Sequence, residues 1–193
     1  MSKKEKKVEE EEQVGGFPGM LYDWLEIFAI CLVPIILLFI FVGQPVVVEG
    51  SSMVPTLHDR DLMAVQRIGY TPRQGDVVIL NDPFLNITSP IVKRVIAVGG
   101  QTVDIDYVAG TVSVDGKVLS EPYINYEPME RPWYVKEDAT HITVPEGSVF
   151  VMGDNRNHST DSRHEELGPV DTRRIIGHAL AVMFPFGDMG AIE

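Results

Sequence analysis

The chain has 193 residues and a mass of 21.5 kDa, the size of one domain with a small appendage. With 45% hydrophobic and 23% charged residues, it is neither a wholly disordered chain nor a multi-span transporter. The net charge of −12 repels phosphate backbones, so we expect no nucleic-acid partner. The single cysteine, Cys31, excludes an intrachain disulfide and a zinc site made of cysteines.

Residues 1–23 are predicted to form a charged tail. The tail opens with MSKKEKKVEEEEQV, which holds four lysines, five glutamates and almost no side chain that could be buried. Such a segment is expected to be solvated and without a fold of its own. Whether its acidic run has a partner is left open.

Residues 24–43 are predicted to be a transmembrane helix. Ile27 to Val48 contains 22 residues without a charge, and a bilayer core requires roughly 20 apolar residues in a helix. A buried helix of a soluble core and a cleavable export signal are the alternatives. The length of the run and the lack of an A-x-A site favour an uncleaved anchor. Lysines 3, 4, 6 and 7 precede the span, which predicts a cytoplasmic N-terminus.

Residues 44–193 are expected to form one extracytoplasmic β-rich domain. Short apolar or alternating runs, separated by Gly, Pro, Asn and Asp, predict strands. These runs are Asp76–Leu80, Ile91–Val98, Thr102–Ile105, Thr111–Val114 and Ser148–Met152. The fold class is therefore mainly β, with one N-terminal transmembrane helix.

A small irregular insertion is expected within the domain at about residues 104–144. Its latter part, from Glu121 onward, is marked by prolines and lacks clear periodicity. One local feature is specific, because Asp115-Gly116 stands between two alternating segments and predicts a hairpin with a type I′ turn.

Several kinds of chemistry find no support in the sequence. No GxSxG elbow, P-loop or dinucleotide fingerprint is present, and no carboxylate pair stands apart for glycoside chemistry. The run 153–161 resembles a calcium loop, but it lacks the sixth-position glycine. The histidines lack the spacing of a zincin and are expected to lie on the surface; they are His58, His141, His158, His164 and His178. The sequence therefore predicts neither metal nor cofactor.

Three segments carry residues that could act together. Gly50–Leu57 presents Ser52 on a turn, Ile91–Ile96 places Lys93 within a β-branched run, and Gly153–Arg163 is densely polar. Each segment has a structural alternative: a turn serine, an edge-strand lysine that blocks aggregation, and a polar loop. Because neighbouring residues of a strand point to opposite faces, the lysine or the arginine that follows it should face inward.

The order of these segments resembles the motif boxes of bacterial type I signal peptidases, which are membrane-bound Ser-Lys proteases. The matching boxes are SMVPTL at 52–57, GDVVIL at 75–80, IVKRVIAVGG at 91–100 and GDNRNHSTDSR at 153–163. The resemblance runs from the anchor to about Met183. It implies a β-rich catalytic domain of the signal-peptidase and repressor-peptidase type.

The resemblance implies that Ser52 is the nucleophile and Lys93 its general base. Gly50 stands where some members of the family have an oxyanion-hole serine, as is common in the Gram-positive branch. The oxyanion would then rely on backbone N–H groups, including that of Ser52. Met53 and Val92 flank the pair and are expected as walls of a substrate pocket.

Five further residues are expected to support this pair. By resemblance, Ser159 orients the lysine through a hydrogen bond, Asp161 and Arg163 form a supporting ion pair, and Asp154 pairs with Arg94. The lysine must be neutral to act as a base, which requires a pKa well below its reference of about 10.4. Apolar neighbours can lower this pKa by burial, and Arg94 can do so by like charge if it is incompletely paired.

The implied activity is the removal of signal peptides from secretory preproteins on the outer face of the membrane, after small residues at the first and third positions before the cut. The partners are such preproteins and the lipid bilayer. Two alternatives stay open: a self-cleaving Ser-Lys peptidase of the repressor type, and a membrane-tethered β binding module without catalysis. Activity of a Ser-Lys enzyme should rise with pH. The sequence leaves the oligomeric state and the identity of the preproteins open.

Overall fold

The computed structural model of the chain describes residues 17–42, 45–81, 89–125, 127–135 and 140–192. The chain divides into two compact units, Met1–Phe41 and Val42–Glu193. The predicted tail lies outside the described residues as far as residue 16. The second unit contains every strand among the described residues, so the prediction of a mainly β protein with an N-terminal apolar helix is confirmed.

The first unit is built around helix α2, Phe17–Val42. The helix begins before the predicted Trp24 because Pro18 lies in its first turn, where the missing N–H breaks no helical bond. Within it, Gly19–Ile36 has a mean hydropathy of 1.7, and the side chains from Met20 to Ile36 are exposed. Among the described residues, this is the one helix long and apolar enough to cross a membrane.

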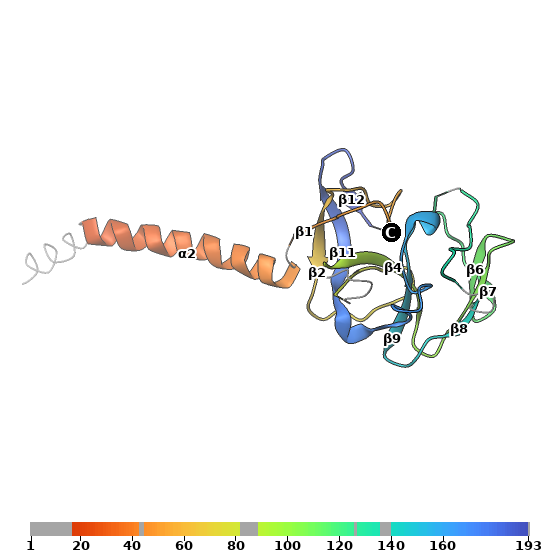
Figure 1. The fold of residues 1–193 in the computed structure, drawn as a ribbon. Coiled ribbons are helices and arrows are strands. Elements are labelled where there is room, and N and C mark those ends of the chain that lie inside the picture. The colour runs from red at the N-terminus through yellow and green to blue at the C-terminus, as the bar shows by residue number, and fades with distance from the viewer. Residues whose placement is uncertain (1–16, 43–44, 82–88, 126, 136–139, 193) are drawn as a thin grey trace, which may run out of the picture. The chain divides into compact units, whose positions relative to one another are not determined.

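Among its described residues, the second unit contains strands and two short 3-10 helices, and Figure 1 labels most of the strands. All five predicted strand runs match observed strands to within one residue, because alternating β-branched residues bounded by turn residues leave little choice of structure. The elements are β1 Val46–Val47, β2 Leu62–Gln66, β3 Val77–Leu80, β4 Ile91–Val98, β5 Thr102–Asp106, β6 Thr111–Val114, β7 Lys117–Val118, β8 His141–Thr143, β9 Ser148–Met152, η2 Arg156–His158, β10 Val170–Asp171, η3 Thr172–Arg174, β11 Ile175–Phe184 and β12 Gly190–Ala191.

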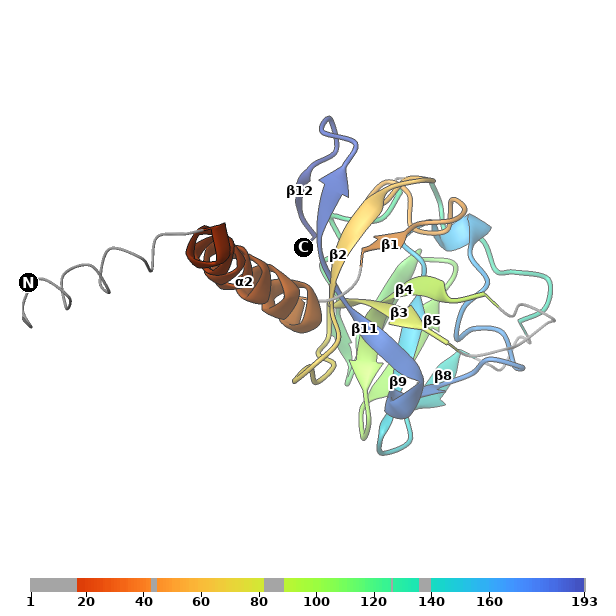
Figure 2. The ribbon, with the colours of Figure 1, turned by 90° about the vertical axis from the view of Figure 1, so that its left-hand side faces the viewer.

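The described strands form two sheets. The larger sheet has eight strands in the order β1-β2-β11-β3-β4-β9-β10, with β12 paired to β11. Figure 2 shows β1 beside β2 and β2 beside β11 at one end of this sheet. Strand β4 pairs antiparallel with both β3 and β9, so it lies inside the sheet. The strand that carries Lys93 is therefore central, and the edge-strand alternative is wrong.

The predicted irregular insertion at 104–144 is partly a second sheet. Four strands form it in the order β7-β6-β5-β8, and β6 to β8 lie beyond β9 in Figure 1. The predicted hairpin is confirmed, because Asp115 and Gly116 have φ angles of 52° and 77°, the positive values that a type I′ turn requires. Only the described part of 119–140 lacks strands, so the irregularity is confined to that stretch.

Buried side chains form three apolar clusters around the two sheets. One cluster joins β4 and β9 to the second sheet through Phe150 and its neighbours. Another packs Met53 and Leu57 of the turn after β1 against β2, β3 and β11. The third contains Val95 and Val151. The cluster that contains Met53 and Leu57 attaches the segment that carries Ser52 to the larger sheet.

Candidate active site

Ser52 lies on the turn that follows β1. Its neighbour Met53 is 1% exposed and Leu57 is fully buried, and the N–H of Leu57 donates to the carbonyl of Met53 at 2.9 Å. Gly50 has a φ of +92°, which favours glycine, and its N–H donates to Oδ1 of Asp59 at 2.8 Å. The apolar anchors and the turn hold the partly exposed Ser52 hydroxyl in one place.

Lys93 reaches Ser52 from the middle of β4. Its Nζ donates to Ser52 Oγ at 2.7 Å and to the carbonyl of Val92 at 2.9 Å. Lys93 is 3% exposed and Arg94 is 1% exposed, so both faces of the strand are covered at this point. The sequence required one of the two to face inward, and the structure buries both. Two residues 41 positions apart thus meet at hydrogen-bond distance.

The environment of Lys93 disfavours its charge. Burial lowers the pKa of Lys93 to about 8. The charges of Asp161 and Asp154 act in the opposite direction, whereas Arg163 adds a smaller lowering effect. The lowered pKa agrees with the expectation for a lysine base. The contributing positive charge is that of Arg163 and not that of Arg94, which the sequence suggested.

Arg94 and Asp154 form the predicted pair. The Nε and Nη2 atoms of Arg94 donate to Oδ1 and Oδ2 of Asp154 at 2.9 and 2.8 Å, and both side chains are 1% exposed. Thr56 Oγ1 also donates to Oδ2 of Asp154. The pair therefore contacts the same turn that carries Ser52.

Asp161 and Arg163 form the second predicted pair, with both side chains fully buried. The Nε and Nη2 atoms of Arg163 donate to Oδ1 and Oδ2 of Asp161 at 2.8 and 2.9 Å, and the N–H of Gly153 donates to Oδ2 at 3.0 Å. Burial alone would raise the pKa of Asp161, but the charge and hydrogen bonds of Arg163 hold it below its usual value. The carboxylate is thus charged at neutral pH and fixes the loop after β9.

Ser159 lies near this group without the predicted hydrogen bond to Lys93. Its Oγ is buried and has no hydrogen-bond partner of good geometry among the described residues, although its nearness to Asp161 contributes to the lowered pKa of that carboxyl. It packs on Gly153, where an added Cβ would lie 2.2 Å from Ser159 Oγ and 2.5 Å from the carbonyl oxygen of Ser52. The absent side chain of Gly153 is what allows the loop and the turn to approach so closely.

A cleft of about 480 Å³ opens beside Ser52 and Lys93. Both predicted pocket residues, Met53 and Val92, belong to its wall. The complete lining is Val46, Val47, Val48, Glu49, Gly50, Ser52, Met53, Ile79, Ser89, Pro90, Ile91, Val92 and Lys93.

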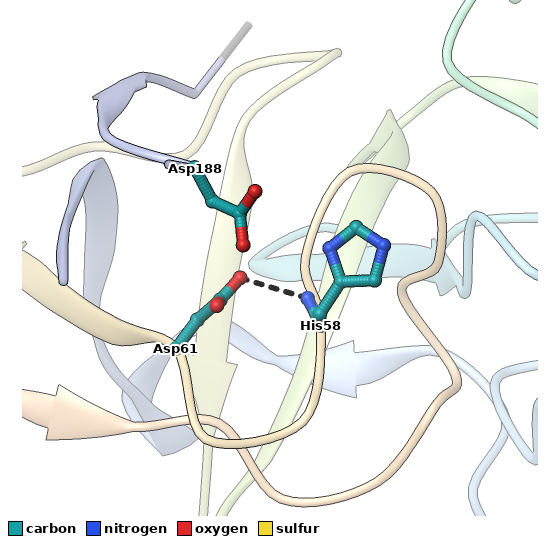
Figure 3. Close-up of side chains that lie close together, drawn as sticks. All are labelled: His58, Asp61 and Asp188. Atoms are coloured by element: carbon teal, nitrogen blue, oxygen red, sulfur yellow. Dashed lines mark hydrogen bonds between the residues drawn. The ribbon is translucent and has the colours of Figure 1, made fainter. Parts of the chain in front are cut away.

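The five histidines are exposed or partly exposed, as predicted. Figure 3 shows one of them, His58, beside Asp61 and Asp188, with ligand atoms within 4.8 Å of one another, a spacing that could hold a metal ion. Within this group, Oδ2 of the buried Asp61 accepts the N–H of His58 at 2.8 Å and closes the turn between them. The group contains neither Ser52 nor Lys93, and the chemistry of a serine and a lysine requires no metal.

Sequence reasoning gave no role to several residues that contact the site. Asn155 donates its N–H to the carbonyl of Ser52 at 3.0 Å and its Nδ2 to that of Ser51 at 3.1 Å. Asn155 lies within the polar box and Thr56 within SMVPTL, so membership of a motif could have indicated both. Glu121 in the insertion pairs with Arg156 of the polar box, and no motif of the sequence contains this glutamate.

Comparisons with known proteins identify the family of the chain. The family model described as signal peptidase, peptidase S26, matches residues 21–184. Signal peptidase I of Bacillus licheniformis is 36% identical over 185 residues, which cover 93% of this chain and 97% of that protein. Probable signal peptidase I-1 of Synechocystis is 37% identical over 177 residues, or 87% of this chain and 85% of that protein.

A solved structure, that of a signal peptidase I from Enterococcus faecalis V583, is 30% identical and covers 56% of this chain and 97% of that chain, with a TM-score of 0.44. The family match spans most of the chain, and the Bacillus relative aligns over nearly its whole length. This chain therefore belongs to the peptidase S26 family of signal peptidases, which are serine proteases of the hydrolase class.

Proposed function

We propose that this chain is a membrane-anchored serine endopeptidase that removes signal peptides from secretory preproteins, with Ser52 as nucleophile and Lys93 as general base. The observation that carries the proposal is the 2.7 Å contact between Lys93 Nζ and Ser52 Oγ, made by a buried lysine whose pKa is lowered to about 8. A serine hydroxyl needs a neighbouring base to become a nucleophile, and a neutral lysine can take that part.

The chemistry follows from these two groups. Neutral Lys93 accepts the Ser52 proton as Oγ attacks the scissile carbonyl, and the resulting ammonium returns a proton to the leaving amine. The acyl-enzyme ester is then hydrolysed by a water whose proton passes to Lys93, which restores the free serine. At a pKa of about 8, about a tenth of the lysines are neutral at pH 7, against roughly one in 3,000 at 10.5.

The oxyanion is assigned to backbone donors. The N–H of Ser52 donates to no acceptor among the described residues, so it is available to a developing negative charge. The N–H of Asn155 donates to the carbonyl of Ser52 and so holds the peptide between Ser52 and Met53 in place. A preorganised donor of this kind typically contributes roughly 10²–10³ in rate.

The supporting roles go to the two buried ion pairs. Asp154 with Arg94 contacts the turn of Ser52 through Thr56, and Asp161 with Arg163 fixes the loop that packs on it. Ser159 is assigned to the lysine once substrate is bound, because its buried hydroxyl has no hydrogen-bond partner of good geometry among the described residues.

The cleft beside the pair is proposed to take the end of the signal peptide. The segments Val46–Val48 and Ser89–Val92 both line this cleft together with Ser52. Strand β1 pairs only with β2 in the sheet order, so an extended peptide could pair along its other edge. Met53 and Val92 are assigned as walls that favour small side chains next to the cut.

The N-terminal helix is proposed to anchor the enzyme, with the N-terminus in the cytoplasm and the catalytic unit outside. Helix α2 is apolar and ends at Val42, ten positions before Ser52 in the sequence. The lysines that precede the helix favour the cytoplasmic side. Such a tether suits a substrate whose own apolar segment lies in the bilayer.

The test is cleavage of a signal-peptide-bearing preprotein by the full chain in detergent. Ser52→Ala is compared with Ser51→Ala, which removes the neighbouring exposed hydroxyl. We expect the first variant to be inactive and the second to cleave normally. Cleavage at the wild-type rate by Ser52→Ala would refute the proposal, and an inert wild type would favour a non-catalytic binding module. Cutting of the chain itself without cleavage of the preprotein would favour the self-cleaving alternative.

A further inference from the structure

Two residues of the inserted region, Glu121 and Tyr123, contact arginines that lie next to the active site. The ring of Tyr123 lies over the guanidinium of Arg94, with Cζ 3.9 Å from the ring centroid. Glu121 accepts two hydrogen bonds from Arg156, one of them from Nη1 to Oε2 at 3.0 Å, and the two side chains are 6% and 4% exposed. A cation over a ring and a buried bidentate pair are both strongly directional contacts.

A single carboxylate links these two contacts. The hydroxyl of Tyr123 donates to Oε1 of Glu121 at 3.1 Å, the oxygen that also accepts from Nη2 of Arg156. Burial raises the pKa of Tyr123, with a further contribution from Glu121, so the hydroxyl keeps its proton and remains a donor. Glu121 and Tyr123 therefore form one hydrogen-bonded unit that holds two arginines.

The arginines held by this unit connect directly to the turn of the nucleophile. Asp154, the ion partner of the arginine beneath the ring, accepts a hydrogen bond from Thr56. Asn155 follows in the chain, and its N–H donates to the carbonyl of Ser52 at 3.0 Å. Arg156 completes this run of three residues and pairs with the inserted carboxylate. The run 154–156 thus lies between the inserted unit on one side and the nucleophile's turn on the other.

We propose that Glu121 and Tyr123 are positioning residues, which hold the run 154–156 and through it keep the hydroxyl of Ser52 against Lys93. Neither residue is placed at the reacting atoms. The inference rests on the proposed function, since it assigns a role within the same site.

The experiment uses the full chain in detergent and measures kcat and KM separately, across pH, for cleavage of a preprotein. Tyr123→Leu removes the ring, Tyr123→Phe keeps it, and Glu121→Gln removes the charge that pairs with the arginine. Glu127→Gln is the matched control, because Glu127 is exposed and lies in the same segment.

We expect Tyr123→Leu to lower kcat by about three- to thirtyfold with little change in KM, which is the range of a cation–π contact expressed as a rate. Its pH midpoint should move upward, because burial is what lowers the pKa of Lys93 and a loosened site admits water. Tyr123→Phe should stay within about threefold of the wild type, since the ring over the arginine remains. Glu121→Gln should lower kcat, and Glu127→Gln should change nothing.

The outcomes separate positioning from a merely structural role. Loss of thermal stability in Tyr123→Leu or Glu121→Gln, with kcat and the pH midpoint as in the wild type, would overturn the inference. If Tyr123→Leu does not fold, the near-isosteric Glu121→Gln decides by the same readout. If the wild type cleaves the preprotein and the variants show the same kcat and pH midpoint, this inference is refuted but the proposed function is not. A wild type that does not cleave refutes the proposed function with it.

Discussion

Replacing Lys93 by methionine should stabilise the protein at neutral pH. The folded state lowers the pKa of Lys93 from 10.5 to about 8, which corresponds to a penalty of about 3 kcal/mol on the charged folded form. Lys93→Met removes this penalty and loses the hydrogen bonds to Ser52 and Val92, each contributing about 1 kcal/mol. The net expectation is a gain of about 1–2 kcal/mol in the free energy of unfolding at pH 7.

The pH dependence of this gain is fixed by the direction of the shift. Between about pH 8 and 10.5 the unfolded chain holds a proton that the folded chain has released, so wild-type stability rises with pH over this interval. Below pH 8 both states are charged and the penalty is fully present. The advantage of Lys93→Met should therefore shrink above pH 8, vanish near pH 9 and become a loss of about 1–2 kcal/mol near pH 10.5, where only the missing hydrogen bonds count.

Urea unfolding of both proteins in detergent at pH 7, 9 and 10.5 measures this difference. Lys117→Met is the control, because Lys117 is exposed on β7 and its replacement should leave stability nearly unchanged. A difference between Lys93→Met and the wild type that is the same at all three pH values would refute the assignment of a buried lysine with a lowered pKa.

Three further predictions concern the same group of residues. The rate of preprotein cleavage should rise between pH 6 and 9 with a midpoint near the lowered pKa of Lys93, about 8, and a flat profile would contradict a lysine base. Asp161→Asn leaves the buried Arg163 without its counter-charge and should cost about 3–5 kcal/mol of stability by urea unfolding, so a loss under about 1 kcal/mol would count against the pair. Gly153→Ala places a Cβ 2.5 Å from the carbonyl oxygen of Ser52, and the overpacking should lower stability by about 1–3 kcal/mol and reduce kcat, so a wild-type kcat would contradict the close approach.

Local patterns in the sequence predicted much of the larger sheet. The runs that form β4 and β9 were predicted with their observed bounds because β-branched residues between turn signals specify strands locally. The Asp115-Gly116 turn was likewise a local feature. By contrast, β8 has three residues, too short for a period to be read, so nothing in the sequence showed that the latter part of the region 104–144 returns to a sheet.

The site was predictable only through the ordered motif boxes. They placed Ser52 and Lys93 together, although a serine and a lysine 41 residues apart show no relation in periodicity. They implied the pair of Arg94 with Asp154, 60 residues away in the sequence, but not the contact of that arginine with the ring of Tyr123, which lies outside every box. The contact of Arg156 with Glu121 is of the same kind, since long-range pairing depends on how the sheets pack.

The most direct test of the central claim is covalent labelling by a serine-directed acylating inhibitor, followed by intact-mass measurement and peptide mapping of the full chain in detergent. We expect one label, on Ser52, with a rate that rises with pH around 8 and falls to near zero in Lys93→Met. Labelling of Ser51 or of any other residue instead, or labelling of Ser52 at the wild-type rate in Lys93→Met, would contradict it.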